Sequence, residues 1–458
     1  MVASSSTAKV GSPVSGSIEY RPAIDGLRAV AVLAVFMFHL KRGLLSGGFV
    51  GVDIFFVISG YLITSIIFRD CERNRFSYIR FYQRRIARLL PAFSTVAIFT
   101  IAGASFIYSN QDLASAGATL SAAAAYVANL KFMLQGNYFV ISPDAQPFLH
   151  CWSLSVEEQF YMLFPAIFVL VYWKGREYRA QVLAALCGVS LLFCIVLTHF
   201  RPGWAFYLLP SRAWELLAGS IFATFTERKP TTSRVIASLP FIGLVLILIS
   251  FFVISANQAF PGFLALLPVA GTVCFMTPYD TSGSFGERLL SWGPLALVGR
   301  MSYSLYLWHW PVFSLVDYKF YSESAPFRIA LKVTVSIVAT VLCFFFIERP
   351  SRRFLNNPSR RPMAFALLAC SLLTFIPLGL AIRNADYVNA SIRNVAGGGV
   401  HFNESAKSGT IILMGDSNAS MYGTMMKDVA KQLGLRLTVI SVDAGDPLPH
   451  SSGRRSPL

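Results

Sequence analysis

The sequence predicts an all-α polytopic membrane protein. Of its 458 residues, 55% are hydrophobic and only 14% are charged, which is more apolar surface than a soluble domain of this size can bury. Apolar runs of about 18 residues or more, long enough to cross a bilayer, recur along most of the chain. Residues 1–20 are polar, and no small-residue cleavage site follows the first apolar run, so we do not expect a cleavable signal peptide.

The charge distribution is typical of membrane proteins. The net charge of +16 does not by itself separate a membrane protein from a nucleic-acid-binding one. Much of the positive charge, however, lies in short loops between apolar runs, which is the pattern that orients membrane helices. We therefore expect the lipid bilayer, and no nucleic acid, as a partner. The seven cysteines lack metal-site spacing and mostly lie in apolar runs, so we interpret them as core thiols and expect no metal.

Eleven apolar segments are expected to span the membrane. They are residues 27–44, 49–68, 91–109, 153–173, 181–199, 211–226, 233–255, 259–277, 294–316, 327–347 and 362–382. A further stretch, residues 117–135, is alanine-rich and long enough but only weakly hydrophobic. We interpret this stretch as packed or re-entrant rather than spanning.

The basic loops support that interpretation. Residues 69–88 hold the richest arginine cluster, which places them and the N-terminus in the cytoplasm. If residues 117–135 do not span, three later basic loops also fall inside, and otherwise all three fall outside. These loops are residues 173–179, 226–230 and 348–362. We therefore predict a core of ten spans and an eleventh span that carries residues 383–458 out of the cytoplasm.

The chain changes character after the last span. Residues 401–442 read as a linker, an apolar strand, a tight turn, an amphipathic helix and a second strand, which is the opening of an α/β domain. We divide the chain into a disordered cytoplasmic N-terminus, a transmembrane core, a basic cytoplasmic loop with the eleventh helix, a linker and an incomplete α/β domain. The boundaries are 1–20, 21–350, 351–383, 384–408 and 409–458.

The first span contains two polar residues, Arg28 and His39. In a helix their eleven-residue separation is three turns plus about 20°, so both share one face, roughly 16 Å apart along the axis. Polar side chains in a bilayer are costly and usually face protein or water. A general base and a permanent anion-binding group on one face indicate a functional site. The alternative is that Arg28 is an interfacial positive-inside residue and His39 a packing histidine.

Other polar residues also enter apolar segments. Asp53 lies among aromatics in a glycine-rich span, and its alternative role is a structural pair with an arginine. Glu157 and Glu158 begin a later span, near His150 and Ser155.

Two further segments carry such residues. Arg212 and Glu215 have the i, i+3 spacing of a local ion pair, which we interpret as structural. Arg300, Tyr306 and His309 occur with Tyr303 in the segment 300–313, where the aromatics could form an interfacial belt.

Ser417 lies in the sequence IILMGDSNAS, after an apolar strand and before a helix. A serine at such a turn can be exposed next to backbone N–H groups that form an oxyanion hole. Gly-Asp-Ser is also ordinary turn chemistry, so this motif is the weaker of the candidate sites.

Together these motifs resemble one family, the integral-membrane acyltransferase family 3, whose members O-acylate extracytoplasmic glycans. The resemblance covers about residues 20–350 and rests on several ordered motifs. These are YRPAIDGLRAVAVLAVFMFHL, GGFVGVDIFFVISGYLIT, FYQRRIARLLP, LHCWSLSVEEQFY, RAWELLAG, SYSLYLWHWP and IERP. The next span and the GDS tail resemble the subgroup that fuses this core to an extracytoplasmic SGNH-type domain, so 409–458 would be the start of an SGNH-like domain.

The resemblance implies a cytoplasmic acyl-CoA donor, with acetyl-CoA expected, and no permanently bound cofactor. Arg28 and His39 correspond to the family's essential pair, and Glu157 corresponds to the carboxylate of its W-S-L-x-x-E motif. The basic segment would contact the CoA phosphates through Arg84, Arg85 and Arg88, a role compatible with positive-inside topology. Supporting intramembrane roles are expected for Asp53, Glu158, Arg212, Arg300, Tyr306 and His309.

The tail departs from the SGNH pattern. Position 418 is Asn, where related fused domains often have His, and the later oxyanion blocks and the Asp-x-x-His motif are absent. Ser417 would therefore be catalytic only if the domain is completed, because a serine without a histidine base is a poor nucleophile. Truncation, or a shifted reading frame after about Gly445, would explain this ending.

The expected activity is O-acyl transfer at a bacterial inner membrane, with the N-terminus cytoplasmic and the C-terminus extracytoplasmic. The acceptor would be a cell-surface glycan, such as O-antigen, exopolysaccharide or peptidoglycan, or a lipid-linked oligosaccharide. Two alternatives stay open. A transporter of an acyl donor or glycan intermediate would also use intramembrane Arg, His, Asp and Glu, although no inverted repeat is evident. An inactive remnant acting as an interaction partner would fit the incomplete tail.

Overall fold

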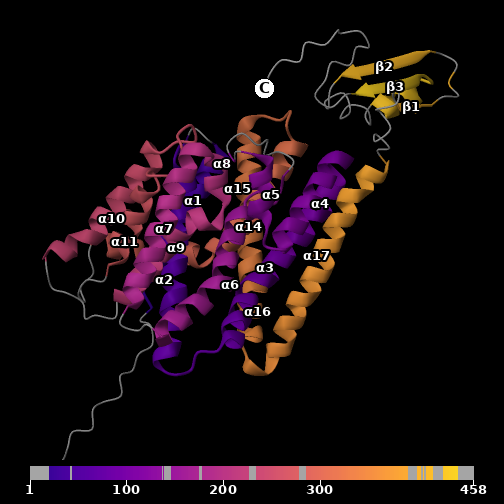
Figure 1. The fold of residues 1–458 in the computed structure, drawn as a ribbon. Helices are drawn as coiled ribbons and strands as arrows, with labels where there is room; N and C mark the ends of the chain where they lie inside the picture. The colour runs from indigo at the N-terminus through magenta and orange to yellow at the C-terminus, as the bar shows by residue number, and fades with distance from the viewer. Residues whose placement is uncertain are drawn as a thin grey trace, which may run out of the picture.

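The computed structural model describes most of the chain. The described residues are 20–41, 44–136, 138, 146–174, 178–225, 234–277, 285–389, 400–403, 406, 409–415 and 426–441. They form a helical bundle followed by a small sheet (Figure 1).

The first three helices contribute many of the buried residues of the bundle. α1 (Pro22–Leu40) starts with a proline, whose missing N–H costs nothing in a first helical turn. A short 3₁₀ turn, η1 (Gly48–Val50), leads into α2 (Gly51–Glu72). α3 (Tyr78–Ile107) begins where the Ser77 side chain accepts a hydrogen bond from the Arg80 N–H.

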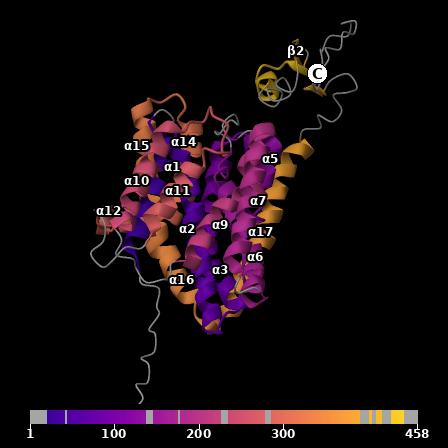
Figure 2. The ribbon, with the colours of Figure 1, turned by 60° about the vertical axis from the view of Figure 1, so that its left-hand side comes forward.

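The remaining helices surround these three (Figure 2). They are α4 (Asn110–Ala124), α5 (Ala128–Gln135), α6 (Cys151–Lys174), α7 (Arg179–Phe200), α8 (Pro202–Tyr207), α9 (Leu209–Phe225), α10 (Arg234–Val253), α11 (Leu266–Met276), α12 (Phe285–Leu290), α13 (Gly293–Arg300), α14 (Ser302–Lys319), α15 (Ala325–Leu342), the π-helical turn η2 (Cys343–Glu348), α16 (Arg349–Leu355), the 3₁₀ turn η3 (Pro358–Arg360) and α17 (Arg361–Asn389).

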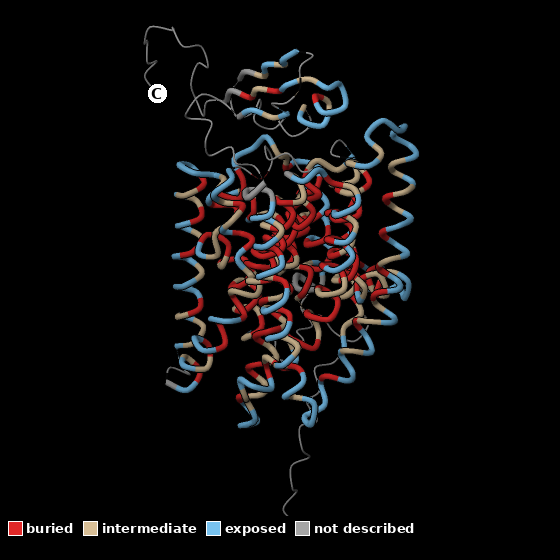
Figure 3. The backbone as a smooth tube through the Cα atoms, turned by 90° about the vertical axis from the view of Figure 1, so that its right-hand side faces the viewer, coloured by how far each residue is buried: buried red, intermediate tan, exposed pale blue. Residues whose placement is uncertain are grey.

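Seven helices within the described residues are long and apolar enough to cross a membrane, so the chain is a multi-pass membrane protein. They are Pro22–Leu40, Gly48–Glu72, Tyr78–Ile107, Cys151–Trp173, Arg179–Phe200, Ala325–Leu355 and Pro358–Ala385. Large apolar side chains cover the outside of the bundle, for example Phe106 at 88% and Leu373 at 76% exposure, while the buried residues gather inside (Figure 3). This arrangement suits a lipid surround.

Four of the eleven expected spans are not among these seven helices. Residues 211–226 and 233–255 each form a single helix, α9 with 17 residues and α10 with 20 residues. Residues 259–277 contain α11, which has 11 residues. Residues 294–316 are divided between α13 and α14. Hydropathy alone does not show these breaks, because an apolar loop buried in a bundle has the same composition as a helix.

The ambiguous stretch 117–135 is divided between α4 and α5. These helices have 15 and 8 residues and are separated at Tyr126, which has a positive φ of 56°. Each is shorter than the roughly 20 residues that a crossing helix needs. Ser121 Oγ donates to the Ile376 carbonyl oxygen at 2.9 Å, so α4 packs along α17.

Two further boundaries differ from the sequence prediction. The basic segment 69–88 is mostly helical, because α2 continues to Glu72 and α3 starts at Tyr78. Arg80, Arg84, Arg85 and Arg88 therefore lie on α3, and the helix determines which side each of them leaves from. α17 continues to Asn389, past residue 383, where the linker was expected to begin.

The tail contains a three-stranded sheet, β1 (Val400–Phe402), β2 (Thr410–Gly415) and β3 (Arg436–Ser441), in the order β1-β3-β2. β2 and β3 are parallel, and residues 426–432 form a helix between them. Ala430 on this helix packs with Leu437 and Val439 of β3. This strand–helix–strand unit agrees with the predicted opening of an α/β domain, and Ser417 and Asn418 lie outside the described residues.

Candidate functional site

A cavity lies between α1, α2, α3, α6 and α14. Its walls combine arginine, glutamate, serine and tyrosine side chains with apolar ones. The lining residues are Arg28, Val52, Phe55, Phe56, Ile58, Ser59, Leu62, Ile63, Arg85, Arg88, Leu89, Ser153, Leu154, Glu157, Tyr161, Ser302, Tyr303 and Tyr306. Mostly apolar walls with a few convergent polar groups are typical of small-molecule and cofactor sites.

Arg28 is held at the cavity wall from two sides. Its Nη1 donates to Asp25 Oδ1 at 3.1 Å, one turn earlier on α1, and its Nη2 donates to Ser302 Oγ at 2.8 Å, at the start of α14. These contacts fix the guanidinium in one orientation. Because a guanidinium stays charged, Arg28 gives this wall a permanent positive charge.

Of the two neighbouring glutamates, Glu157 lines the cavity and Glu158 is not among its lining residues. Glu157 Oε1 accepts a hydrogen bond from Ser59 Oγ at 2.6 Å, which ties α6 to α2. The carboxylate that the family motif indicates is therefore the one that faces the cavity.

The three arginines of the basic segment do not share one role. Arg85 and Arg88 line the cavity, and the Arg85 guanidinium lies 5.6 Å from the ring centre of Tyr161. Arg84 is 45% exposed and forms an ion pair with Asp70 at 3.7 Å, away from the cavity. With Arg28, the cavity wall carries three arginines and one carboxylate, so it suits an anionic ligand.

A cluster of rings surrounds His39 at the end of α1. His39 Nδ1 lies 3.1 Å from His309 Nε2, and His39 Nε2 lies 2.8 Å from the Tyr138 hydroxyl. The Trp310 ring packs edge-on against His39 with 4.6 Å between ring centres. Arg28 and His39 therefore both reach α14, as their predicted common face requires.

Tyr306 connects the cavity to this cluster. It lines the cavity, and its ring centre lies 5.3 Å from that of His309. Its hydroxyl is 2.6 Å from Ser153 Oγ and donates to the His150 carbonyl oxygen at 3.0 Å. These two hydrogen bonds fix the Tyr306 hydroxyl between the cavity and the His39 cluster.

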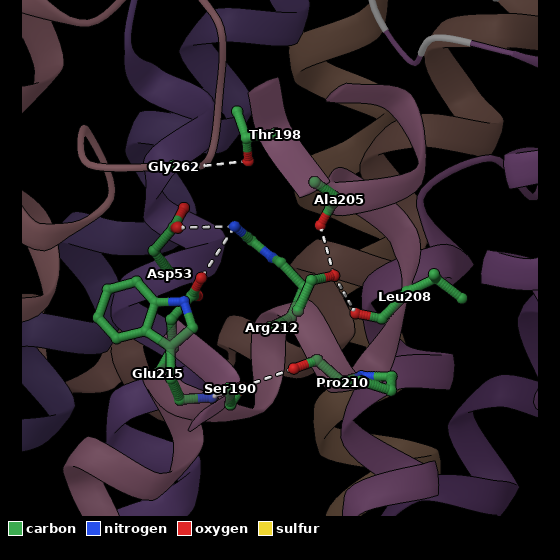
Figure 4. Close-up of polar contacts among 11 residues, drawn as sticks. Asp53, Ser190, Thr198, Ala205, Leu208, Pro210, Arg212, Glu215 and Gly262 are labelled. Carbon is green, nitrogen blue, oxygen red and sulfur yellow. Dashed lines mark hydrogen bonds and ion pairs between the residues drawn. The ribbon is translucent and has the colours of Figure 1, made fainter. Parts of the chain in front are cut away.

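Asp53, Arg212 and Glu215 form a second polar group (Figure 4). None of the three lines the cavity. Arg212 Nη1 lies 3.2 Å from Asp53 Oδ1 and 2.9 Å from Glu215 Oε1, and all three side chains are at most 1% exposed. The expected Arg212–Glu215 pair is present, and Asp53 has the arginine partner of its structural alternative. These contacts join α2 to α9.

Close packing of α2 on α9 brings these charges together. A Cβ atom at Gly60 would lie 1.8 Å from the Leu216 carbonyl oxygen, and one at Gly219 would lie 1.9 Å from that of Val57. Only glycine permits the two backbones to approach this closely. The glycines that the sequence pointed to thus determine where the ionic group forms.

Arg300 is the last residue of α13, is exposed and does not line the cavity. His309, seven residues beyond the start of α14, is buried with 1% exposure, as predicted for that segment.

Several polar residues at the site were not singled out from the sequence. Glu348 is 4% exposed in η2, and its Oε2 accepts from Ser304 Oγ at 2.5 Å. A carboxylate that ends the apolar run FFFIE is the signal that could have identified it. Tyr138 had no such signal, because it is a turn residue after α5 and lies outside the motifs quoted from the sequence. Among the described residues, no three or more His, Cys, Asp or Glu side chains form a metal-binding group.

The fold and this site agree with what family comparison finds. A family model described as an acyltransferase domain matches residues 21–349, so the chain belongs to this acyltransferase family. Among individual proteins, the chain is 32% identical over 386 residues to the O-acetyltransferase OatA of Staphylococcus aureus, which covers 79% of this chain and 62% of the relative. It is also 32% identical over 359 residues to the peptidoglycan O-acetyltransferase OatA of Listeria monocytogenes, covering 74% of this chain and 57% of that protein.

The chain thus spans about three fifths of the length of these relatives. No solved structure matches it.

Proposed function

We propose that the protein transfers an acyl group, with acetyl expected, from cytoplasmic acyl-CoA to a hydroxyl of an extracytoplasmic glycan at a bacterial inner membrane. The observation that carries this proposal is that Tyr306 lines the arginine-lined cavity and also packs against His309, the histidine that contacts His39. Family membership supports acyl transfer, the names of two relatives support O-acetylation, and one of these names specifies peptidoglycan.

The cavity arginines would bind the donor. CoA carries several phosphates, and guanidinium groups bind phosphate oxygens through charge-assisted hydrogen bonds. Arg85 and Arg88 come from the start of α3, and Arg28 comes from α1, so the positive charge converges from two helices. The thioester would then lie deeper, near Ser153 and Tyr306.

His39 would serve as the general base. It would take the proton of the acceptor hydroxyl while the hydroxyl oxygen attacks the thioester carbonyl, so that a C–O bond forms and the C–S bond breaks. The CoA thiolate then leaves and takes up the proton that His39 removed from the hydroxyl, so that His39 becomes neutral again. Glu157 lines the cavity, and the hydrogen bond from Ser59 would hold its carboxylate in place to assist this proton transfer.

The C-terminal domain belongs to the same proposal. An SGNH-type domain, if completed beyond the described strand–helix–strand unit, would receive the acyl group on Ser417 and pass it to the glycan.

The direct test uses membranes that contain the full chain, radiolabelled acetyl-CoA and an isolated cell-wall glycan. His39→Ala should lower label transfer by about 10²-fold or more, because it removes the base. His199→Ala is the matched control, since His199 is exposed on α7. Transfer that survives in His39→Ala would overturn the assigned role. Uptake of label without covalent attachment in the wild type would instead indicate a transporter.

A further inference from the structure

The contact between His309 and the backbone of its own helix determines which nitrogen of His309 carries hydrogen. Nδ1 of His309 lies 2.6 Å from the Tyr306 carbonyl oxygen, three residues earlier on α14. A carbonyl oxygen only accepts hydrogen bonds, so the hydrogen must be on Nδ1 of His309. The imidazole ring of His309 cannot flip without breaking this hydrogen bond to the Tyr306 carbonyl oxygen.

His309 then determines the hydrogen on His39. His309 is 1% exposed and packs against Phe313, with 5.9 Å between ring centres, so it is kept neutral by the high cost of a buried charge. The Nε2 of a neutral His309 with hydrogen on Nδ1 carries a lone pair and accepts. At 3.1 Å, the hydrogen between the two rings is therefore on Nδ1 of His39. The ring centres lie 5.2 Å apart and the ring planes differ by 17°, a geometry compatible with a hydrogen bond between the two nitrogens.

This leaves Nε2 of His39 as the basic atom. The Tyr138 hydroxyl, 2.8 Å away, donates to it and marks where a hydroxyl group can bind. When Nε2 takes a proton, the Nδ1–H of His39 stays on His309, so the new imidazolium keeps its partner. No proton has to move to His309.

We propose that His309 is a positioning residue that holds His39 in the Nδ1–H tautomer, so that Nε2 accepts the proton of a hydroxyl at the position marked by Tyr138. This inference rests on the proposed function, since it assigns the base atom for acyl transfer. It also explains why a second histidine is buried inside a membrane bundle, where an apolar residue would be less costly.

Other titratable groups pack close to this pair. They include Tyr138 and Tyr306, and His150 next to the start of α6, with 5.7 Å between the ring centres of His150 and His309. A pH profile of activity therefore reports the whole group, and a direct measurement of the tautomer is needed.

The first measurement is nitrogen-15 NMR of histidine-labelled full-length protein in lipid bilayers. We expect His39 with Nδ1 protonated and Nε2 unprotonated, assigned by loss of its signals in His39→Ala. His309→Phe keeps a ring but removes the acceptor, so His39 should become a mixture of both tautomers. His39 in the Nε2–H tautomer in the wild type, or an unchanged tautomer in His309→Phe, would overturn the proposal. This readout does not depend on any enzymatic activity, so it fails or succeeds separately from the proposed function.

The second measurement is acetyl transfer. His309→Phe should lower kcat by about 10²-fold while KM for acetyl-CoA stays the same, because a wrong tautomer removes the base and not the donor site. His309→Gln offers a carbonyl oxygen to the His39 Nδ1–H and should recover at least about 10-fold of that loss. His199→Phe, on the outside of α7, is the control for a ring substitution. Equal losses in His309→Gln and His309→Phe would indicate a packing role only and overturn the proposal.

Discussion

Tyr306 and Ser153 hydrogen-bond at 2.6 Å between α14 and α6, where the arginine-lined cavity meets the histidine cluster. The Tyr306 hydroxyl also donates to the His150 carbonyl oxygen at 3.0 Å. The two ends of the site are thus joined by one side chain whose position is fixed from α6.

Tyr306→Phe keeps the ring and removes both hydrogen bonds. We expect a loss of about 1–3 kcal/mol in the free energy of unfolding, because the Ser153 hydroxyl and the His150 carbonyl are buried. We also expect acetyl transfer to fall more than stability alone explains. Thermal unfolding in detergent and initial rates at saturating acetyl-CoA measure the two effects. A fully active variant would show that Tyr306 is not needed between the two ends.

Arg85→Gln and Arg88→Gln should each weaken binding of acyl-CoA. A charge-assisted hydrogen bond to phosphate contributes about 1.5–3 kcal/mol, which corresponds to a KM increase of about 10- to 100-fold. Arg84→Gln is the matched control on the same helix, because Arg84 is exposed and paired with Asp70 outside the cavity. Steady-state kinetics with varied acetyl-CoA measure the difference. An equal effect of all three variants would mean that net charge, and not the cavity, binds the donor.

Arg212→Met should lower the free energy of unfolding more than any substitution of a cavity residue does. The substitution leaves Asp53 and Glu215 buried without their cation, which costs about 3–5 kcal/mol. The triple variant with Asp53→Asn and Glu215→Gln removes the charges together and should regain most of that loss. Denaturation curves of the three proteins test this. If the triple variant is as stable as the wild type but inactive, the ionic group has a role beyond joining α2 to α9.

Gly60→Ala should separate α2 from α9. The added Cβ would lie 1.8 Å from the Leu216 carbonyl oxygen, so one backbone must move. We expect a destabilisation of about 2 kcal/mol or more, in the range of overpacked core sites. Gly188→Ala is the control, because nothing lies within 4 Å of a Cβ at that position in α7. Alanine is the better helix former, so this control should be neutral or slightly stabilising.

Much of the architecture could be predicted from the sequence. Apolar composition and basic loops were sufficient to predict a helical membrane protein, since lipid requires long helices whose backbone groups are satisfied within the helix. Helical periodicity was sufficient to place Arg28 and His39 on one face, because 3.6 residues per turn holds in any environment. The Arg212–Glu215 pair could be recognised for the same local reason, whereas Glu157 was selected through the resemblance to the family motif.

The tertiary structure determines which polar side chains contact one another. His39 meets His309, Glu157 meets Ser59 and Asp53 meets Arg212 across long stretches of chain, and no local pattern encodes these pairings. The same holds for Arg84 and Arg300, which are arginines in the expected motifs but lie outside the cavity. Sequence determined which faces are polar, because helical geometry is local. Only packing determined which polar faces meet, because that depends on the close approach of backbones at residues such as Gly60 and Gly219.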